Sequence, residues 1–193
     1  MPEEADAVLV SRASHGDVAA FESLYRKYNT MVFRTAYAIL RDRFGAEEVT
    51  QESFVRAYRS LHRVDAGASL GPWLHRIAVN LSYNWWKNAR RHWVFPLQSA
   101  ICEARLFYGE SPTGALRQSE LRDAVAKALE SLGFEQRVPL ILFYLGGFSL
   151  DEIAYVLDCP VGTVKSRLHY GRSNLKRELE RAWSAIPEVA YEF

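Results

Sequence analysis

The residues best suited to bind a chemical partner are concentrated near the C-terminus, between Val161 and Arg177. Cationic and hydroxyl side chains can contact phosphates, and Arg, Lys, Ser and His can also hydrogen-bond to base edges. The residues of this kind that we select are Lys165, Ser166, Arg167, His169, Tyr170 and Arg172. A helix with such a face suits a DNA major groove, although an ordinary helix with a solvated basic face would show the same pattern.

The preceding residues could hold this segment in place. Ser149 and Glu152 have the spacing of a capping box, which predicts a helix start and a short helix that ends near Leu157. The turn Asp158–Pro160 follows, where Asp tolerates a left-handed conformation and Pro suits the first turn of the next helix. The second helix has an apolar stripe of Val161, Val164, Leu168 and Leu175. Two helices joined by a three-residue turn are typical of a helix-turn-helix.

A second candidate surface lies in a segment that contains no Asp or Glu, from Ala66 to Cys102. After a loop over Gly67–Gly71, Pro72 is expected to begin a helix whose apolar stripe includes Trp73, which we interpret as a core residue. Asn, Arg and Lys can contact bases and phosphates, and aromatic rings can stack on unpaired bases. The outward residues of this kind are Asn80, Tyr83, Asn84, Lys87, Arg90 and Arg91.

The N-terminal part predicts two helices. Asp17 is a plausible N-cap for a long amphipathic helix that ends near Arg41, and Gly45 should interrupt the chain before a second helix, Ala46 to about His62. The second helix should turn five residues inward: Val49, Phe54, Ala57, Tyr58 and Leu61. Its outward residues Glu47, Glu48, Gln51 and Glu52 are either a solvated acidic face or a docking patch for a basic partner. Without further context the solvated face is the simpler interpretation.

The composition limits the possible functions. The 193 residues carry a net charge of +1 and 49% apolar residues, which favours one or two folded domains over disorder. Cys102 and Cys159 are too few for a disulfide framework, and the histidines and cysteines show no metal-ligand spacing. No phosphate-binding glycine loop or nucleophile motif occurs, so neither an enzyme nor a cofactor is expected. With no signal peptide or apolar run of membrane-spanning length, a cytoplasmic protein without membrane insertion is expected.

The periodicity predicts an all-α fold of two small helical domains. The first covers residues 1–95, a linker covers 96–115, the second domain covers 116–186, and a tail covers 187–193. Helices resume near Leu116, and a further helix is expected over Phe134–Leu145, with Pro139 in its first turns.

Four motifs together resemble the extracytoplasmic-function sigma factors, the small two-domain members of the sigma-70 family. They are AFESLYRKY (Ala20–Tyr28), AEEVTQESFVRAYRSL (Ala46–Leu61), PWLHRIAVNLSYNWWKNARR (Pro72–Arg91) and SLDEIAYVLDCPVGTVKSRLHYGRSNL (Ser149–Leu175). The resemblance implies a sigma-2-like helical bundle, then a linker, and a sigma-4-like four-helix domain that contains the helix-turn-helix. It also implies a transcription initiation factor that directs bacterial RNA polymerase core to promoters.

The resemblance assigns roles to the three surfaces. The T-Q-E-x-F pattern of the family docks on the clamp helices of the polymerase beta-prime subunit, which implies core docking by Glu48, Thr50, Gln51, Glu52 and Phe54. The outward residues of the acid-free helix would read the minus-10 element, and those of the second helix of the helix-turn-helix the minus-35 element. The implied partners are RNA polymerase core, including its beta flap, promoter DNA and an anti-sigma factor, often membrane-anchored, that would hold the protein inactive.

The sequence departs from the family pattern at four positions. Leu70 stands where Phe is frequent, Asp158 replaces the usual turn Gly, Tyr170 replaces a common Arg, and Pro139 is unusual in its helix. These changes bear on promoter specificity more than on fold. The alternative function is a stand-alone helix-turn-helix regulator that binds duplex DNA as a dimer, which would leave the acid-free helix without a role.

Overall fold

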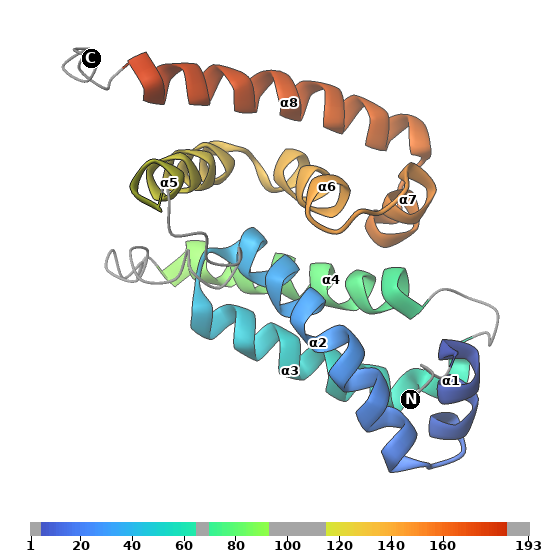
Figure 1. Cartoon of the computed structure of the whole chain (residues 1–193). Coiled ribbons are helices and arrows are strands. Elements are labelled where there is room, and N and C mark those ends of the chain that lie inside the picture. Colours follow the sequence, from blue (N-terminus) through green and yellow to red (C-terminus); the bar gives the residue numbers. More distant parts are fainter. Residues whose placement is uncertain (1–4, 65–69, 93–114, 185–193) are drawn as a thin grey trace.

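The computed structural model describes residues 5–64, 70–92 and 115–184, in which helices are joined by short turns and no strand occurs. Figure 1 shows two helical bundles, one above the other. The N-terminal bundle contains α1 (Asp6–Ser14), α2 (Val18–Leu40), α3 (Arg43–Ser60), the 3-10 turn η1 (Leu61–Arg63) and α4 (Leu70–His92). The C-terminal bundle contains α5 (Ala115–Ser131), α6 (Phe134–Tyr144), α7 (Leu150–Leu157) and α8 (Val161–Ser184). The all-α, two-bundle prediction is confirmed.

The N-terminal bundle is built on α2, which packs against α1, α3 and α4. Asp17 caps α2 as predicted, because its carboxylate accepts from the N–H groups of Ala19 and Ala20 at 3.0 and 3.1 Å. Helix α1 was not predicted. Its Leu9 and Val10 are buried, and its Asp6 accepts a hydrogen bond from the Tyr28 hydroxyl of α2.

The junction of α2 and α3 differs from the sequence expectation. Gly45 lies inside α3 and does not separate two helices, because Asp42 is the N-cap and accepts from the Gly45 N–H. Helix α3 therefore begins at Arg43, before the predicted Ala46, and gives way to η1 after Ser60. Helix α4 likewise begins at Leu70, before the predicted Pro72.

The C-terminal bundle confirms the predicted helix-turn-helix, formed by α7 and α8. The Ser149 hydroxyl accepts from the Glu152 N–H at 3.3 Å, and the Glu152 carboxylate accepts from the Ser149 N–H at 2.8 Å, which completes the capping box. Asp158 ends α7 in the left-handed conformation, with φ 51°. Pro139 lies inside α6, as expected, where its ring is buried.

The two bundles are in contact along two lines, α4 against α7 and α2 against α6 (Figure 1). The predicted linker 96–115 lies outside the described residues except for Ala115, which begins α5. The predicted tail 187–193 also lies outside them.

Candidate nucleic-acid interface

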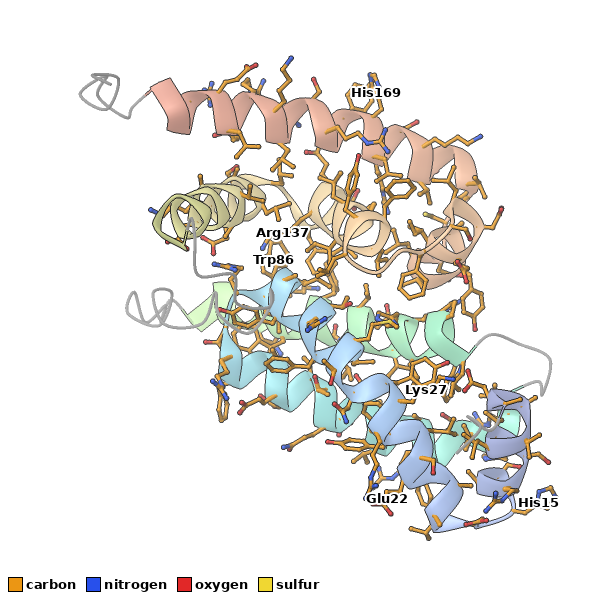
Figure 2. All side chains as sticks on the ribbon, viewed as in Figure 1. His15, Glu22, Lys27, Trp86, Arg137 and His169 are labelled. Atoms are coloured by element: carbon orange, nitrogen blue, oxygen red, sulfur yellow. The ribbon has the colours of Figure 1, made fainter. Side chains whose placement is uncertain are left out.

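The outer face of α8 presents the residues predicted to contact DNA. Val164 and Leu168 are buried against the rest of the bundle, and this fixes which side of α8 faces outward. Figure 2 shows His169 on the side of α8 that points away from α6. The exposed residues of the predicted set are Lys165, Ser166, His169, Tyr170 and Arg172. Their spacing places them on adjoining turns of one helix face, so α8 offers a continuous cationic and hydroxyl-rich surface.

Two of the α8 arginines are held by other side chains. The Nη2 of Arg167 lies 3.0 Å from Glu135, at the start of α6, and Arg167 is half-buried. The guanidinium of Arg172 lies over the rings of Phe143 and Tyr144, at 5.4 and 5.6 Å from their centroids. These contacts restrict both arginine side chains within the C-terminal bundle.

A glycine sets how closely α8 lies on α6. Gly171 is buried, and a Cβ on it would lie 3.2 Å from the Gln136 carbonyl oxygen and 3.2 Å from Leu140 Cδ1. The sequence analysis did not identify this residue. The sequence feature that could have identified Gly171 is its position between the polar residues Tyr170 and Arg172, because a helix-interior glycine often marks a close helix contact.

A second exposed polar surface lies on the C-terminal half of α4. Asn80, Asn84 and Lys87 are exposed at helical spacing, and Tyr83 is 43% exposed beside them. The side chains of Arg90 and Arg91 lie outside the described part of the structure. Trp73 is partly buried against the core, in agreement with its interpretation as a packing residue.

The surfaces of α4 and α8 meet at a cleft of about 630 Å³. One wall comes from Tyr83 and Trp86 of α4, whose rings lie 5.2 and 5.5 Å from that of Phe134. The other walls come from the start of α6 and from α8, where Ser166 and Arg167 take part. The structure therefore brings residues from both predicted DNA-binding sets to the edges of one cleft.

The predicted docking patch on α3 divides into an outer and an inner set. Glu48 and Gln51 are exposed, and Glu52 is half-buried with its carboxylate 2.7 Å from Arg56. Thr50 and Phe54 are buried. The Thr50 hydroxyl donates to the Ala46 carbonyl at 2.7 Å. The inner set therefore supports the exposed residues of the patch from the core side of α3.

An aromatic surface beside this patch was missed by the sequence analysis. Tyr58 was predicted to point inward but is 47% exposed, because Phe54 and Ala57 already fill the core side of α3. Its ring packs edge-on against Phe21, at 4.9 Å between centroids. Val55 is also exposed, at 42%, so the α3 surface is mixed apolar and acidic and not simply solvated.

A buried histidine lies on the core side of α4. His75 is fully buried, its Nδ1 donates to the Gly71 carbonyl at 2.8 Å, and its Nε2 accepts from the Thr35 hydroxyl at 3.1 Å in the matching tautomer. Burial lowers the pKa of His75, an effect that outweighs the hydrogen bond to Gly71.

No group of three potential metal-ligating side chains occurs within the described ranges, and none of the described helices is both long and apolar enough to cross a membrane.

Comparisons with known proteins identify relatives that share this architecture. Residues 24–92 match the family description "Sigma-70 region 2", and residues 122–175 match "Sigma-70, region 4". The RNA polymerase sigma-H factor of Pseudomonas aeruginosa is 32% identical over 93% of this chain and 96% of its own length. The ECF RNA polymerase sigma-E factor of Escherichia coli K12 is 34% identical over 91% of this chain and 94% of its own length.

Solved structures show the same fold. A sigma factor RpoE from Bartonella quintana, solved with the anti-sigma factor NepR, is 26% identical, has a TM-score of 0.67, and aligns over 83% of this chain and 96% of its own. CnrH, solved with the cytosolic domain of CnrY, is 23% identical with a TM-score of 0.69, over 92% of this chain and 99% of its own.

The helix-turn-helix and the two matched regions define a sigma factor, a non-enzymatic transcription initiation factor. The chain belongs to the sigma-70 family, and within it to the extracytoplasmic-function group.

Proposed function

We propose that the protein binds bacterial RNA polymerase core through α3, reads the minus-10 element with α4 and reads the minus-35 element with α8. The observation that carries this proposal is the separation of three exposed surfaces on three helices. Glu48 and Gln51 lie on α3, Asn80 and Asn84 on α4, and Lys165 on α8. Polymerase and each of the two DNA elements would therefore be bound by a different helix of the chain.

The proposed roles follow from the chemistry of each surface. On α4, Asn side chains can make two-point contacts with adenine, and Tyr83 can stack on an unpaired base. Capture of unpaired bases would offset the few kcal/mol that unstacking costs. Arg90 and Arg91 would add phosphate contacts on the same helix. On α8, Arg167 would contact base edges, and Lys165 and Arg172 would contact phosphates.

We also propose control by an anti-sigma factor and a cytoplasmic location. Support comes from the Bartonella quintana relative, which was solved with an anti-sigma factor. The acidic and aromatic surface of α3 would contact the beta-prime clamp helices, and the C-terminal domain would contact the beta flap. We place the domain limits near residues 95 and 116.

The test is run-off transcription with purified bacterial RNA polymerase core, with and without the protein, on a promoter from its own genomic neighbourhood. Specific start sites that depend on the protein are expected. A stand-alone regulator would instead bind a palindromic duplex tightly without polymerase, because two copies of α8 would read two half-sites. Duplex binding without initiation or core binding would replace the proposal by this alternative.

A further inference from the structure

Tyr170 is an exposed aromatic residue on the face of α8 that is proposed to read DNA. It is 62% exposed, and its ring packs edge-on against that of His169, with 5.4 Å between the centroids. His169 is exposed as well, and Figure 2 shows it on the side of α8 that points away from α6. The two rings therefore form an aromatic pair on a surface that is open to a partner.

The buried residues of α8 determine which side chains lie at the centre of its outer face. Val164 and Leu168 are buried. At about 100° per residue, Ser166 points directly away from their midpoint, and Tyr170 lies within about 40° of the same direction. Lys165 lies about 100° from it, on the flank of the helix. A helix in the major groove turns its centre to the base edges and its flanks to the phosphates, so Tyr170 is placed to face bases.

Tyr170 also lies at the right place along the helix. In a helix-turn-helix the N-terminal turns of the second helix contact the base edges. Helix α8 has 24 residues and is about 36 Å long, whereas the groove is only about 12 Å wide. Tyr170 lies within about the first three turns of α8. Ser166, the other central residue, is short, and its hydroxyl already donates to the Gly162 carbonyl at 3.0 Å.

The chemistry of the tyrosine side chain limits what Tyr170 can read. It replaces the arginine that is common at this position in the family pattern, and arginine can donate two hydrogen bonds to guanine O6 and N7. A phenol has a single O–H group and cannot make this two-point contact. Its ring is apolar and can pack against the 5-methyl group of thymine, which is the apolar feature of the major groove.

We propose that Tyr170, packed against His169, recognises a thymine of the minus-35 element through the 5-methyl group of the base. Tyr170 thereby makes thymine, and not guanine, the preferred base at the contacted position. The inference rests on the proposed function, because it takes α8 as the helix that reads the minus-35 element. It adds the residue that determines one position of that element and the class of base that this residue selects.

The first step of the test identifies the contacted position. The full-length protein, bound to purified bacterial RNA polymerase core, selects from promoter duplexes in which the minus-35 region is randomised. The wild type should select thymine, on one strand or the other, at a position where Tyr170→Arg selects guanine. Tyr170→Ala should show no preference there. Because Tyr170 is mostly exposed, these substitutions should leave the fold intact.

The second step removes only the methyl group. Deoxyuridine replaces the selected thymine, because the two bases form the same pair and differ in the 5-methyl group. In competition binding the wild type should lose about fourfold in affinity, the factor for one buried methyl-sized group. Tyr170→Phe should retain this difference, and Tyr170→Ala should bind both duplexes equally. Arg181→Ala, about three turns farther along α8, is the control and should retain the wild-type difference.

A second pair of duplexes measures the same contact independently. Cytosine or 5-methylcytosine is placed at the selected position, so that these two duplexes also differ only in the methyl group. The wild type should bind the methylated duplex more tightly by a similar factor, and Tyr170→Ala should not distinguish the two. A merely structural role of Tyr170 would lower affinity for every duplex equally and leave both ratios unchanged.

The outcomes separate this inference from the proposed function. The inference is overturned if removal of the methyl group has no effect on the wild type at any selected thymine of either strand. It is equally overturned if Tyr170→Ala keeps the wild-type ratio of thymine to deoxyuridine binding. If the wild type with polymerase core selects no minus-35 sequence at all, the proposed role of α8 fails instead.

Discussion

The indole ring of Trp85 lies directly against Gly45, where a side chain would otherwise project from the first turns of α3. A Cβ on Gly45 would be 2.6 Å from Trp85 Cε2 and 2.7 Å from Cζ2. Real Cβ atoms essentially never approach another atom so closely. The missing side chain at Gly45 therefore allows α3 and α4 to pack at their observed distance, and it joins the candidate docking helix to the candidate minus-10 helix.

We predict that Gly45→Ala lowers the free energy of unfolding by about 1–3 kcal/mol, the usual cost of forcing extra volume into a packed site. The gain in helix propensity of about 1 kcal/mol would offset only part of the strain. Urea denaturation followed by circular dichroism measures the change. Gly162→Ala on α8 is the control, because no atom lies within 4 Å of its Cβ position and it should be neutral or stabilising. A Gly45→Ala protein as stable as the wild type would refute this packing role.

The sequence predicted the helices with clear periodicity and caps but not those defined by long-range contacts. The Asp17 cap, the Ser149 capping box and the Asp158 turn were all found, because each depends on residues a few positions apart. Helix α1 was missed, since its stability comes from contacts such as that of Asp6 with Tyr28 of α2. Gly45 was interpreted as a break because its partner, Trp85, lies forty positions away in the sequence.

The candidate surfaces were predicted less completely than the helices. Helical spacing identified the outward residues of α8, but it could not show that Arg167 is paired with Glu135. It placed Tyr58 in the core, because periodicity alone gives a wide apolar arc and not the exact edge of the buried face. The contact between the bundles, including Arg137 with Ile39, had no local signal, since its partners are separated by almost a hundred residues.

His75 should make stability depend on pH. Burial lowers the pKa of His75 in the folded protein, so the unfolded chain binds more protons than the folded protein in mildly acidic solution. The free energy of unfolding should therefore be constant above about pH 6.5 and fall as the pH decreases below that, by at most about 1.4 kcal/mol per pH unit from this group.

Urea denaturation between pH 5 and 8 measures this dependence, and the comparison is His75→Gln. The variant loses stability at all pH values, because it disturbs the hydrogen bonds to Gly71 and Thr35, but its dependence on pH in this window should be weaker. His62→Gln, at an exposed position on η1, serves as the control and should keep the wild-type dependence. An equal slope in His75→Gln and the wild type would exclude His75 as the source.

Arg167→Ala should weaken recognition of the minus-35 element while polymerase binding is retained. Loss of a good base contact costs about 1–3 kcal/mol of discrimination, or about 5- to 150-fold in affinity. Competition binding of the polymerase-bound factor to matched and mutated minus-35 sequences measures this discrimination. Arg181→Ala, farther along α8 and paired with Glu178, is the control and should discriminate as the wild type does. Loss of core binding by Arg167→Ala would count against the proposed role of α8.

Glu52→Ala should impair binding to polymerase core without changing the fold. Glu52 is half-buried beside the exposed Gln51, and its pairing with Arg56 is a solvent-facing contact that contributes little to stability. The expected effect is therefore on affinity for core, measured by titration of labelled protein with purified polymerase, and a loss of about tenfold is the scale of one charge-assisted contact.

Glu47→Ala is the matched control for Glu52→Ala. Glu47 is exposed on the same helix and forms the same kind of pair, with Arg43 at 2.8 Å, but it lies outside the proposed docking set. Equal losses in the two variants would mean that core binding responds to the acidic charge of α3 in general. A loss confined to Glu52→Ala would mean that polymerase contacts one face of the helix, the face that Thr50 and Phe54 support from the core.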